Sequence, residues 1–294
     1  MGLKVLPGPL MSERTTLKLG GPALAEVHIG HERDLDELPA VLEKAGGRPM
    51  VLGWGSNILA SDDTLPIVLL RVPEGGGPRI VHETGERVTV QADAGMRLPR
   101  LLTWCAKQGL SGLEGLVGIP GSVGGAVAMN AGSFGCEMAE VLSRVLLFSP
   151  CCGLRWVGRE DVRMDYRFFA PRTYDDYFIV MGVELDVIRA EKPLVDEVMA
   201  RHMTTKKASQ PISAASAGCV FKNPEGDAAG RLLEQAGFRG KGLGGMIFSE
   251  IHANFLVNAG GGTSEQAFEL IASARDEVTR RFGVGLELEV KVVS

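Results

Sequence analysis

The sequence predicts an α+β protein with more than one domain. At 294 residues the chain is long enough for two or three modest domains, each with its own core. Three apolar segments separated by turn residues follow one another between Ser143 and Val187, which favours an irregular sheet over a regular βαβ repeat. The composition changes after a helical stretch that ends before Pro211, so a domain boundary is expected near residue 195.

Helices and strands can be assigned in order along the first two thirds of the chain. A helix-like stretch at 34–44 is followed by Val51 and Leu52, predicted as a strand that runs into a tight glycine turn at 53–62. Strands are expected at 67–72 and 87–95, and an amphipathic pattern at 98–110 predicts a helix that ends at Gly109. The next elements are strands at 143–148, 154–157 and 177–187 and a helix over 191–211.

The last third of the sequence predicts a compact α+β unit able to fold around its own core. Helices are expected at 228–238, where Gly237 is the stop signal, and at 264–283. Strands are expected at 216–223, 252–258 and 286–293.

The composition excludes several classes of protein. With 31 Lys and Arg against 36 Asp and Glu, the net charge of −5 gives no basic excess for a DNA or RNA partner. The sequence has neither a long apolar run for a membrane span nor a secretory signal at its start, so a cytoplasmic protein is expected.

The five cysteines have no metal-type spacing, so no metal site is expected. An odd number without a CxxC pair suits reduced thiols, most of them buried as small hydrophobic residues. Cys151 and Cys152 are adjacent, after a proline and before a glycine. This turn-like setting allows redox chemistry, but an ordinary surface loop is the favoured interpretation.

Glycine is the unusual residue, with 39 copies clustered at a few places and no collagen-like period. A loop with several glycines can turn its backbone N–H groups inward and let a phosphate come close. The clusters at 53–62 and 112–135 therefore predict a dinucleotide site. Neither a GxGxxG pattern at Gly53 nor any GxxxxGK pattern occurs, which excludes Rossmann-type and Walker-type sites.

Several sequence blocks in order carry a resemblance to a known family. The blocks are TTLKLGGPA, GWGSNIL, GLEGLVGIPGSVGGAVAMNAGSFG, YR, SAGCVFKNP, AGRLLEQAG, SEIHANFLVN and LELEV. Together they resemble the UDP-N-acetylenolpyruvoylglucosamine reductase (MurB) family, in its shorter class, from about Thr15 onward. The resemblance implies an FAD-binding domain of the vanillyl-alcohol-oxidase (PCMH) type in two subdomains, at 1–70 and 71–195, and a C-terminal α+β substrate domain at 196–294.

The resemblance also implies the cofactor site. One flavin loop would be formed by Gly53, Gly55, Ser56, Asn57, Ile58 and Leu59. The pyrophosphate and ring would be cradled by Gly118, Ile119, Pro120, Gly121, Ser122, Gly124, Gly125 and Asn130. Both sets lie in the glycine clusters for which backbone chemistry alone predicts anion binding.

The family reaction reduces the enolpyruvyl ether of UDP-N-acetylglucosamine enolpyruvate to give UDP-N-acetylmuramate, with FAD as cofactor and NADPH as co-substrate. Cys219 stands where the family ordinarily has the serine that donates the proton, and a thiol with an ordinary pKa of roughly 8.5 can do so at neutral pH. Arg167 matches the arginine that stabilises charge developing on the substrate carboxylate. Glu289 matches the C-terminal glutamate, and alternation places it on the strand face opposite Leu288 and Val290.

Binding of the nucleotide-sugar substrate is implied for Tyr166, Lys222, Asn223 and Arg231. His252 is expected to be structural rather than an acid or base. The chain departs from the family pattern at Phe169, commonly serine, and at Ile251, commonly lysine, as well as at Cys219. A small-molecule substrate is the only partner expected, and the protein is expected to be a monomer.

Two other interpretations fit part of the pattern. A flavoprotein oxidase or dehydrogenase of the same superfamily would keep the FAD loops but give Cys219, Arg167 and Glu289 no common role. A silent flavin or UDP-sugar binder would have lost its acid with the serine-to-cysteine change. The C-terminal blocks argue against the first, and Arg167 and Glu289 at matching places argue against the second.

Overall fold

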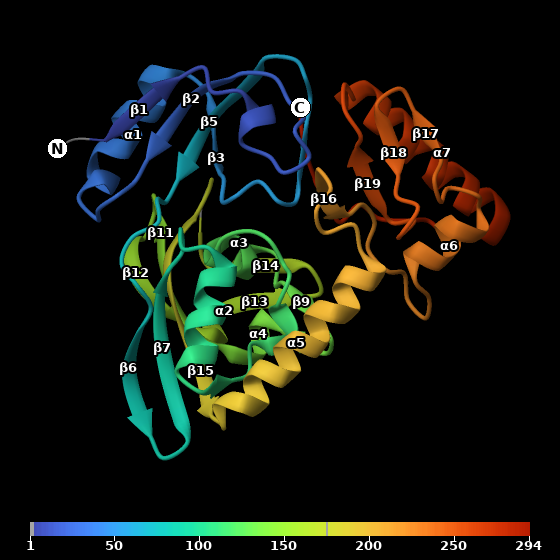
Figure 1. Ribbon diagram of the computed structural model, residues 1–294. Helices are drawn as coiled ribbons and strands as arrows, with labels where there is room; N and C mark the ends of the chain where they lie inside the picture. The colour runs from blue at the N-terminus through green and yellow to red at the C-terminus, as the bar shows by residue number, and fades with distance from the viewer. Residues whose placement is uncertain (1–2, 175) are drawn as a thin grey trace. The chain divides into compact units, whose positions relative to one another are not determined.

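The computed structural model describes residues 3–174 and 176–294 and divides them into two compact units (Figure 1). Unit 1 contains the N-terminal residues through Val5 together with Glu26–Trp54 and Val68–Thr205. Unit 2 contains Leu6–Ala25, Gly55–Ile67 and Lys206–Ser294. Because each unit is built from separate chain segments, this division by contacts is distinct from the division by function expected at residues 70 and 195, which stays a prediction.

Three strands, β1, β2 and β5, contribute residues to both units, and β3 lies in unit 1. These four strands form one sheet of order β1-β2-β5-β3. Its members are β1 (Lys4–Pro7), β2 (Ala23–His28), β5 (Leu65–Arg71) and β3 (Arg48–Val51). Helix α1 (Asp34–Ala45) precedes β3, as the sequence predicts, and the strand expected at 67–72 is β5.

A six-stranded antiparallel sheet dominates unit 1, with the order β12-β11-β15-β7-β6 and β8 paired to β15. Its strands are β6 (Arg79–Thr84), β7 (Arg87–Asp93), β8 (Leu110–Ser111), β11 (Leu142–Ser149), β12 (Gly153–Gly158) and β15 (Ile179–Arg189). Central strand β15 is mostly buried and pairs Val183 with Val145 on one side and with Ala92 on the other. The three strands expected between 143 and 187 are confirmed, because antiparallel neighbours need only short turns between them.

Helix α2 (Leu98–Lys107) shows how local signals set an element in unit 1. It buries Leu98, Leu101, Leu102 and Cys105, an i, i+3, i+4, i+7 stripe. The chain leaves the helix at Gln108, and Gly109 then takes a left-handed φ of 65°. The predicted end at Gly109 is therefore confirmed, because glycine adopts this conformation without a Cβ penalty.

The glycine-rich stretch at 112–135 is not a continuous loop. It contains the 3-10 helix η2 (Glu114–Leu116), the short helix α3 (Val123–Ala128) and strand β9 (Gly132–Ser133). Val123 and Val127 of α3 are fully buried in the core of unit 1. The remaining elements of unit 1 are β10 (Cys136–Glu137), α4 (Met138–Val141), η3 (Arg159–Asp161), β13 (Val162–Asp165), β14 (Phe168–Pro171) and α5 (Lys192–Ser209), which extends into unit 2.

Unit 2 packs two helices with a sheet of order β16-β19-β18-β17. The elements are η1 (Met11–Glu13), β4 (Ile58–Ala60), β16 (Ser216–Cys219), α6 (Ala229–Gln235), β17 (Gly242–Leu243), β18 (Met246–Phe248), β19 (Phe255–Asn258), α7 (Ser264–Phe282) and β20 (Lys291–Val293). Helix α7 confirms the helix predicted at 264–283; it starts with a capping box of Thr263 and Gln266 and is followed by left-handed Gly283. Phe221, Phe238 and Phe248 are buried at its core.

The final strand is shorter than predicted. The sequence predicts a strand over 286–293, whereas β20 contains only Lys291–Val293 and pairs in parallel with β4. The N–H groups of Glu289 and Val290 both donate to the carbonyl of Val220, at 2.8 and 3.3 Å. Two donors on one acceptor break the regular ladder, so the chain is irregular before β20.

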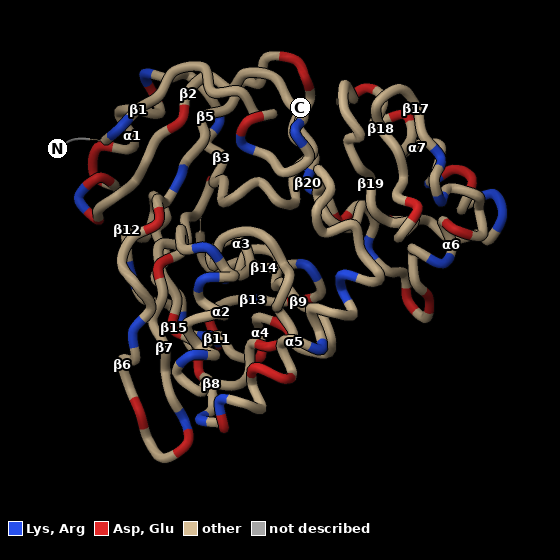
Figure 2. The backbone as a smooth tube through the Cα atoms, in the orientation of Figure 1, with Lys and Arg blue, Asp and Glu red and all other residues tan. Residues whose placement is uncertain are grey.

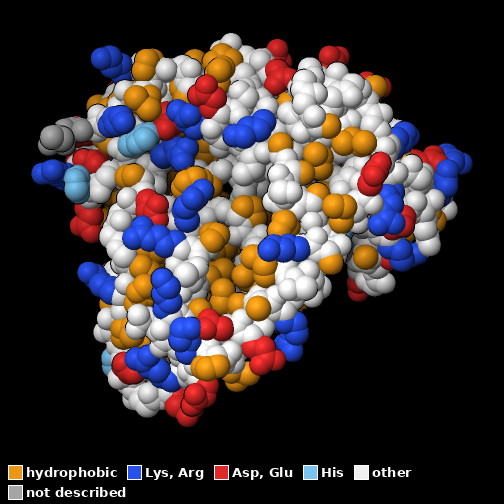
Figure 3. All heavy atoms as spheres, in the orientation of Figure 1, with side chains coloured by type: hydrophobic (Ala, Val, Ile, Leu, Met, Phe, Trp, Pro, Cys, Tyr) orange, Lys and Arg blue, Asp and Glu red, His pale blue; other side chains and the backbone are white. Residues whose placement is uncertain are grey.

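Charged side chains of both signs are interspersed along the chain and over the displayed face (Figures 2 and 3). None of the helices in the described residues combines the length and hydrophobicity that a membrane-crossing helix needs. Within the same residues, no group of three or more His, Cys, Asp or Glu side chains could hold a metal ion.

Asn254 is 2% exposed and fixes the segment that follows β16. Its Oδ1 accepts from Phe221 N at 3.0 Å, and its Nδ2 donates to Phe221 O at 2.8 Å. Asn254→Ala should lower the free energy of unfolding by about 2–4 kcal/mol, because two buried backbone groups lose their partner. Urea unfolding followed by circular dichroism would measure the loss. Gln235→Ala, which removes an exposed amide in the same unit, should change it little, and equal effects would contradict this account.

Candidate active site

Gly53 and Ser122 bring the two predicted flavin loops together within unit 1. A Cβ on Gly53 would lie 2.5 Å from Ser122 Oγ, so only glycine allows this approach. Ser122 Oγ in turn accepts a hydrogen bond from Gly125 N at 3.1 Å and caps α3. Gly121, with a φ of 126°, holds the preceding turn in a conformation that side chains rarely adopt. Gly53, Ser122 and the turn at Gly121 are therefore closely packed, and with Gly124 and Gly125 they are called the glycine cradle below.

Arg97 is a candidate site residue that the sequence analysis did not identify. It forms a β-bridge with Ser122, and its guanidinium carbon lies 4.0 Å from the ring centre of Trp54. Trp54 is the residue that follows Gly53, so a cation and an aromatic plane adjoin both glycine loops. No spacing rule links positions 54 and 97, and only the folded contact identifies the pair.

Asn130 is 1% exposed, and its amide is fully engaged inside unit 1. Its Nδ2 donates to Glu137 Oε2 at 2.9 Å and to Asp165 O at 3.1 Å, while its Oδ1 accepts from Ala139 N at 2.9 Å. With these bonds made, the side chain orders the loop. Contact with a cofactor is then left to the neighbouring backbone, which takes a left-handed φ of 39° at this residue.

Arg167 is held in a strained turn beside Asn130. Tyr166 and Arg167 form the two-residue connection between β13 and β14, and Arg167 has a φ of 58°. A side chain in this region costs about 1–2 kcal/mol, and such strain is concentrated at functional sites. The guanidinium donates to Asn130 O at 3.4 Å and to Gly132 O at 3.1 Å, and it lies 4.8 Å from the Tyr166 ring centre. The arginine is therefore fixed next to the glycine loop.

The predicted flavin loop at 53–59 passes from unit 1 into unit 2 after Trp54, so most of it belongs to unit 2. Ile58 and Leu59 are in β4, and the side chain of Leu59 is buried in the core of unit 2, which anchors this end of the loop. Asn57 O accepts from Lys291 N at 2.9 Å, and Asn57 Nδ2 donates to Glu289 O at 3.0 Å. The predicted flavin loop is thus bound directly to the segment that carries Glu289.

Thr16 ties the same loop to the strand that carries Cys219. Thr16 N donates to Gly55 O at 3.1 Å, and Thr16 Oγ1 donates to Ser216 O at 2.6 Å. The sequence block TTLKLGGPA contributed to the resemblance, but no role was assigned within it. Its second threonine, Thr16, connects the 53–59 loop to β16.

Cys219 ends β16 directly after a β-bulge. Ser216 pairs with Val257 and Cys219 with Phe255, so β16 has one more residue than β19 over this interval. Gly218 takes a φ of 77°, which places the bulge just before the cysteine. Bulges re-aim the side chain that follows them and are frequent beside active sites. The strand expected at 216–223 therefore ends at Cys219 as a regular element.

Glu289 lies beside the Cys219 segment. It is not on a strand face, as the alternation predicted, but in the irregular segment before β20. Its N–H donates to Val220 O at 2.8 Å, next to Cys219 in the chain. Within unit 2, one backbone and one side-chain hydrogen bond therefore connect Glu289 to Val220, beside Cys219, and to Asn57.

The four predicted substrate-binding residues have different local roles. Lys222 Nζ lies 3.3 Å from Glu287 Oε2, and Asn223 Oδ1 accepts from Ala229 N at the start of α6 at 3.0 Å. Arg231 pairs with Asp227 one turn earlier, which raises the arginine pKa and lowers the aspartate pKa through their side-chain hydrogen bonds. Lys222 and Asn223 follow Cys219 directly, and Tyr166 adjoins Arg167 in unit 1.

Burial favours the neutral form of one histidine and two cysteines outside the predicted site. Burial lowers the pKa of His252, whose Nδ1 accepts from Asn254 N at 3.2 Å, which agrees with a structural role. Burial raises the pKa of the Cys105 thiol to about 12 and that of Cys136 to about 11. Neither of these two thiols is reactive at neutral pH.

The family departures lie in contrasting places. Phe169 is 5% exposed in the core of unit 1, with its ring 5.7 Å from that of Phe178, whereas Ile251 is 48% exposed. The buried ring of Phe169 therefore contributes apolar contacts to the core of unit 1 that a serine side chain could not make.

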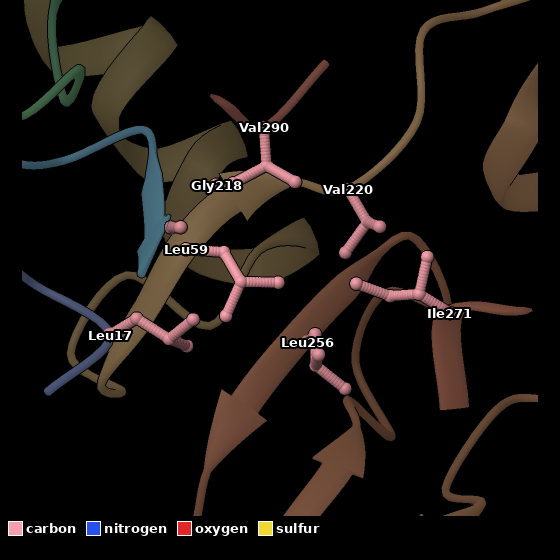
Figure 4. Close-up of a pocket in the computed structure, with 8 residues that line it drawn as sticks. Leu17, Leu59, Gly218, Val220, Leu256, Ile271 and Val290 are labelled. Atoms are coloured by element: carbon pink, nitrogen blue, oxygen red, sulfur yellow. The ribbon is translucent and has the colours of Figure 1, made fainter. Parts of the chain in front are cut away.

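A cavity of about 10 Å³ lies beneath β16 in unit 2 (Figure 4). Its lining is Leu17, Leu59, Ala217, Gly218, Val220, Leu256, Ile271 and Val290. Such a volume is at the lower limit for one water molecule, and the apolar lining offers no hydrogen bonds. It is a packing gap rather than a substrate site.

Fold and loops together define the class of protein, an FAD-binding flavoprotein. Residues 23–150 match the family model of the FAD binding domain, and residues 210–293 match that of the UDP-N-acetylenolpyruvoylglucosamine reductase C-terminal domain. The glycine cradle of unit 1 lies within the first match.

Relatives of similar length carry the particular identification. The chain is 53% identical to UDP-N-acetylenolpyruvoylglucosamine reductase of Nitratidesulfovibrio vulgaris over 99% of both chains. It is 51% identical to that of Oleidesulfovibrio alaskensis over 98% of this chain and 97% of the relative. The crystal structure of the enzyme from Thermus caldophilus matches with a TM-score of 0.81 at 32% identity over 99% of each chain.

The chain belongs to the UDP-N-acetylenolpyruvoylglucosamine reductase family and is an oxidoreductase with FAD as its cofactor. The predicted α+β fold class is confirmed: an FAD-binding domain is followed by the C-terminal domain of this family. The roles of the individual site residues stay predictions.

Gly53→Ala should weaken FAD binding about tenfold, or roughly 1.4 kcal/mol. The new Cβ would displace Ser122 Oγ, so α3 would lose its cap. Titration of apoprotein with FAD, followed by flavin fluorescence, would give the dissociation constant. Gly76→Ala is the matched control, because nothing lies within 4 Å of a Cβ at that glycine. Unchanged affinity in Gly53→Ala would rule out this contact as part of the cradle.

Proposed function

We propose that the protein catalyses the NADPH-driven, FAD-dependent reduction of UDP-N-acetylglucosamine enolpyruvate to UDP-N-acetylmuramate, a step in peptidoglycan precursor synthesis. The observation that carries the proposal is the junction in unit 2. There Glu289 N donates to Val220 O, next to Cys219, and Glu289 O accepts from Asn57 Nδ2 of the flavin loop. The names of full-length relatives support the same reaction.

FAD, when bound, supplies hydride transfer from NADPH to the substrate alkene. The remaining step is a proton transfer to the neighbouring carbon, and we assign it to the Cys219 thiol. A thiol is protonated at neutral pH and is a stronger acid than the serine hydroxyl common in the family. The bulge at Gly218 aims this side chain, and the pairing of Cys219 with Phe255 holds its backbone.

Arg167 stabilises the negative charge that develops on the substrate carboxylate as the alkene is reduced. A fixed cation accelerates the reaction only if its interaction strengthens in the transition state, and the two backbone carbonyls that hold Arg167 keep it in place in advance. We assign to Glu289 the orientation or polarisation of the same group.

We assign binding of the nucleotide-sugar to Tyr166, Lys222, Asn223 and Arg231. Two are cations suited to the diphosphate, and Asn223 keeps its amide N–H₂ for the base, since its Oδ1 caps α6. Arg231 would exchange its exposed pair with Asp227 for substrate, at little energetic expense. Residues 196–294 would form the substrate domain. A cytoplasmic location and a monomeric state stay predictions.

The reaction is tested by NADPH consumption with the FAD-loaded protein, with and without the enolpyruvyl UDP-sugar. Turnover should require the sugar and fall about 10²- to 10⁴-fold in Cys219→Ala, the usual contribution of a positioned acid. Flavin reduction by NADPH without sugar-dependent turnover would instead indicate a different acceptor.

The pH profile distinguishes the thiol from other acids. Only the protonated thiol donates, so activity should be full below the Cys219 pKa and fall as pH rises through it, near 8.5 for an ordinary thiol. In Cys219→Ser this alkaline fall should disappear, since an alcohol stays protonated over the range. The same variant should also lose sensitivity to mild oxidants. Retention of both properties in Cys219→Ser would exclude the thiol as donor.

Gly218→Ala tests the role of the bulge, with Gly85→Ala as its control. Both glycines have left-handed φ, 77° and 59°, and open space where a Cβ would be, so each variant should lose about 1 kcal/mol of stability. Only Gly218→Ala should lower kcat, by tenfold or more, because the acid is displaced. Equal kcat values in the two variants would show that the bulge does not aim Cys219.

A further inference from the structure

Cys151 and Cys152 form the tip of a hairpin whose shape is set by its neighbours. Strands β11 and β12 pair up to Ser149 and Gly153, leaving three residues in the connection. Cys152 N donates to Ser149 O at 3.2 Å, and Gly153 follows with a φ of 65°. Pro150 occupies the position where its fixed φ favours this turn. The turn is thus fixed independently of the two cysteines.

The turn directs both thiols to the same side. Their sulfur atoms are 2.9 Å apart, and Ser149 Oγ lies 3.5 Å from Cys151 Sγ. Neighbouring side chains on an extended strand point to opposite faces, so this approach is a property of the turn. Cys151 is exposed and Cys152 half-buried, which leaves the pair accessible to small molecules.

The other cysteines of unit 1 cannot compete for the same chemistry. Cys105 is buried and Cys136 half-buried, and their raised pKa values keep them as thiols at neutral pH. Within unit 1, the accessible pair is therefore the place where thiol chemistry should occur.

We propose that Cys151 and Cys152 form a redox-active dithiol that closes reversibly to a disulfide by exchange with a small-molecule disulfide. One cysteine thiolate attacks a sulfur of the external disulfide, giving a mixed disulfide and releasing one thiol. The second cysteine thiolate then attacks the mixed disulfide at the protein sulfur and releases the second thiol. The two cysteines lose two electrons and two protons, which the two released thiols carry away.

Reversibility follows from the spacing of the two residues. Cα atoms across a trans peptide are about 3.8 Å apart, whereas disulfides usually span about 4.4–6.8 Å. A bond between neighbours is therefore strained, and strained or exposed disulfides are the readily reduced ones. The closed form should open again with a modest excess of thiol.

The test uses full-length, FAD-loaded protein, as wild type and with Cys219→Ser, so that the remaining accessible thiol is controlled. Reduced protein is exposed to hydroxyethyl disulfide and followed by intact-mass and peptide mass spectrometry. Cys219→Ser should lose the mass of two hydrogens. In both proteins the 151–152 peptide should lose two hydrogens and resist alkylation, and dithiothreitol should restore its alkylation. Cys151→Ser and Cys152→Ser should instead keep a mercaptoethanol adduct on the remaining cysteine. This adduct should be released at least tenfold more slowly than the mixed disulfide that forms at the same cysteine in the wild type.

Stable adducts on the wild-type pair, no reaction, or loss of two hydrogens in a single variant would overturn the proposal. FAD content and circular dichroism would identify a variant that fails to fold. In that case, the unmodified protein is titrated with phenylarsine oxide, which bridges two close thiols and releases water. One arsenical bound per chain at the 151–152 peptide supports the dithiol, and none bound there overturns it.

Discussion

The carbonyl of Val220 is the point on which the rest of unit 2 depends. It accepts from both Glu289 and Val290, and this shared acceptor ends the regular pairing of the C-terminal segment. The chain then turns into β20, which pairs in parallel with β4 and so completes the loop that begins at Gly55. A single irregularity in hydrogen bonding therefore places an acid candidate, a carboxylate and a cofactor loop within one framework.

In unit 1, predicted site residues are held in place by strained backbone conformations. Asn130 and Arg167 both have left-handed backbone without being glycine, and each is held by the other's neighbourhood: Asn130 Nδ2 bonds Asp165 O, and Arg167 bonds Asn130 O. Such conformations persist only when the surroundings over-determine them. The glycine cradle and the arginine are consequently one rigid assembly, prepared before any ligand arrives.

Local signals in the sequence were sufficient for much of the fold. Gly109 follows the end of α2, the apolar period places α7 at 264–283, and the glycine clusters indicate the FAD-binding region, because these effects act within a few residues. The resemblance supplied the family. What the sequence could not show depends on distant partners: the stacking of Arg97 on Trp54, the clamp of Asn254 on Phe221, and the shortened final strand. The hydrogen bond from Glu289 N to Val220 O, beside Cys219, belongs to the same group.

The parallel pairing of β4 with β20 also sets an order of events during synthesis. Asn57 and Glu289 are 232 positions apart, so one flavin loop remains without its partner strand until almost the whole chain has left the ribosome. A nascent chain therefore cannot complete that loop early. Completion of this predicted flavin loop is coupled in this way to synthesis of the C-terminal segment, and a product that lacks the segment would lack the finished loop.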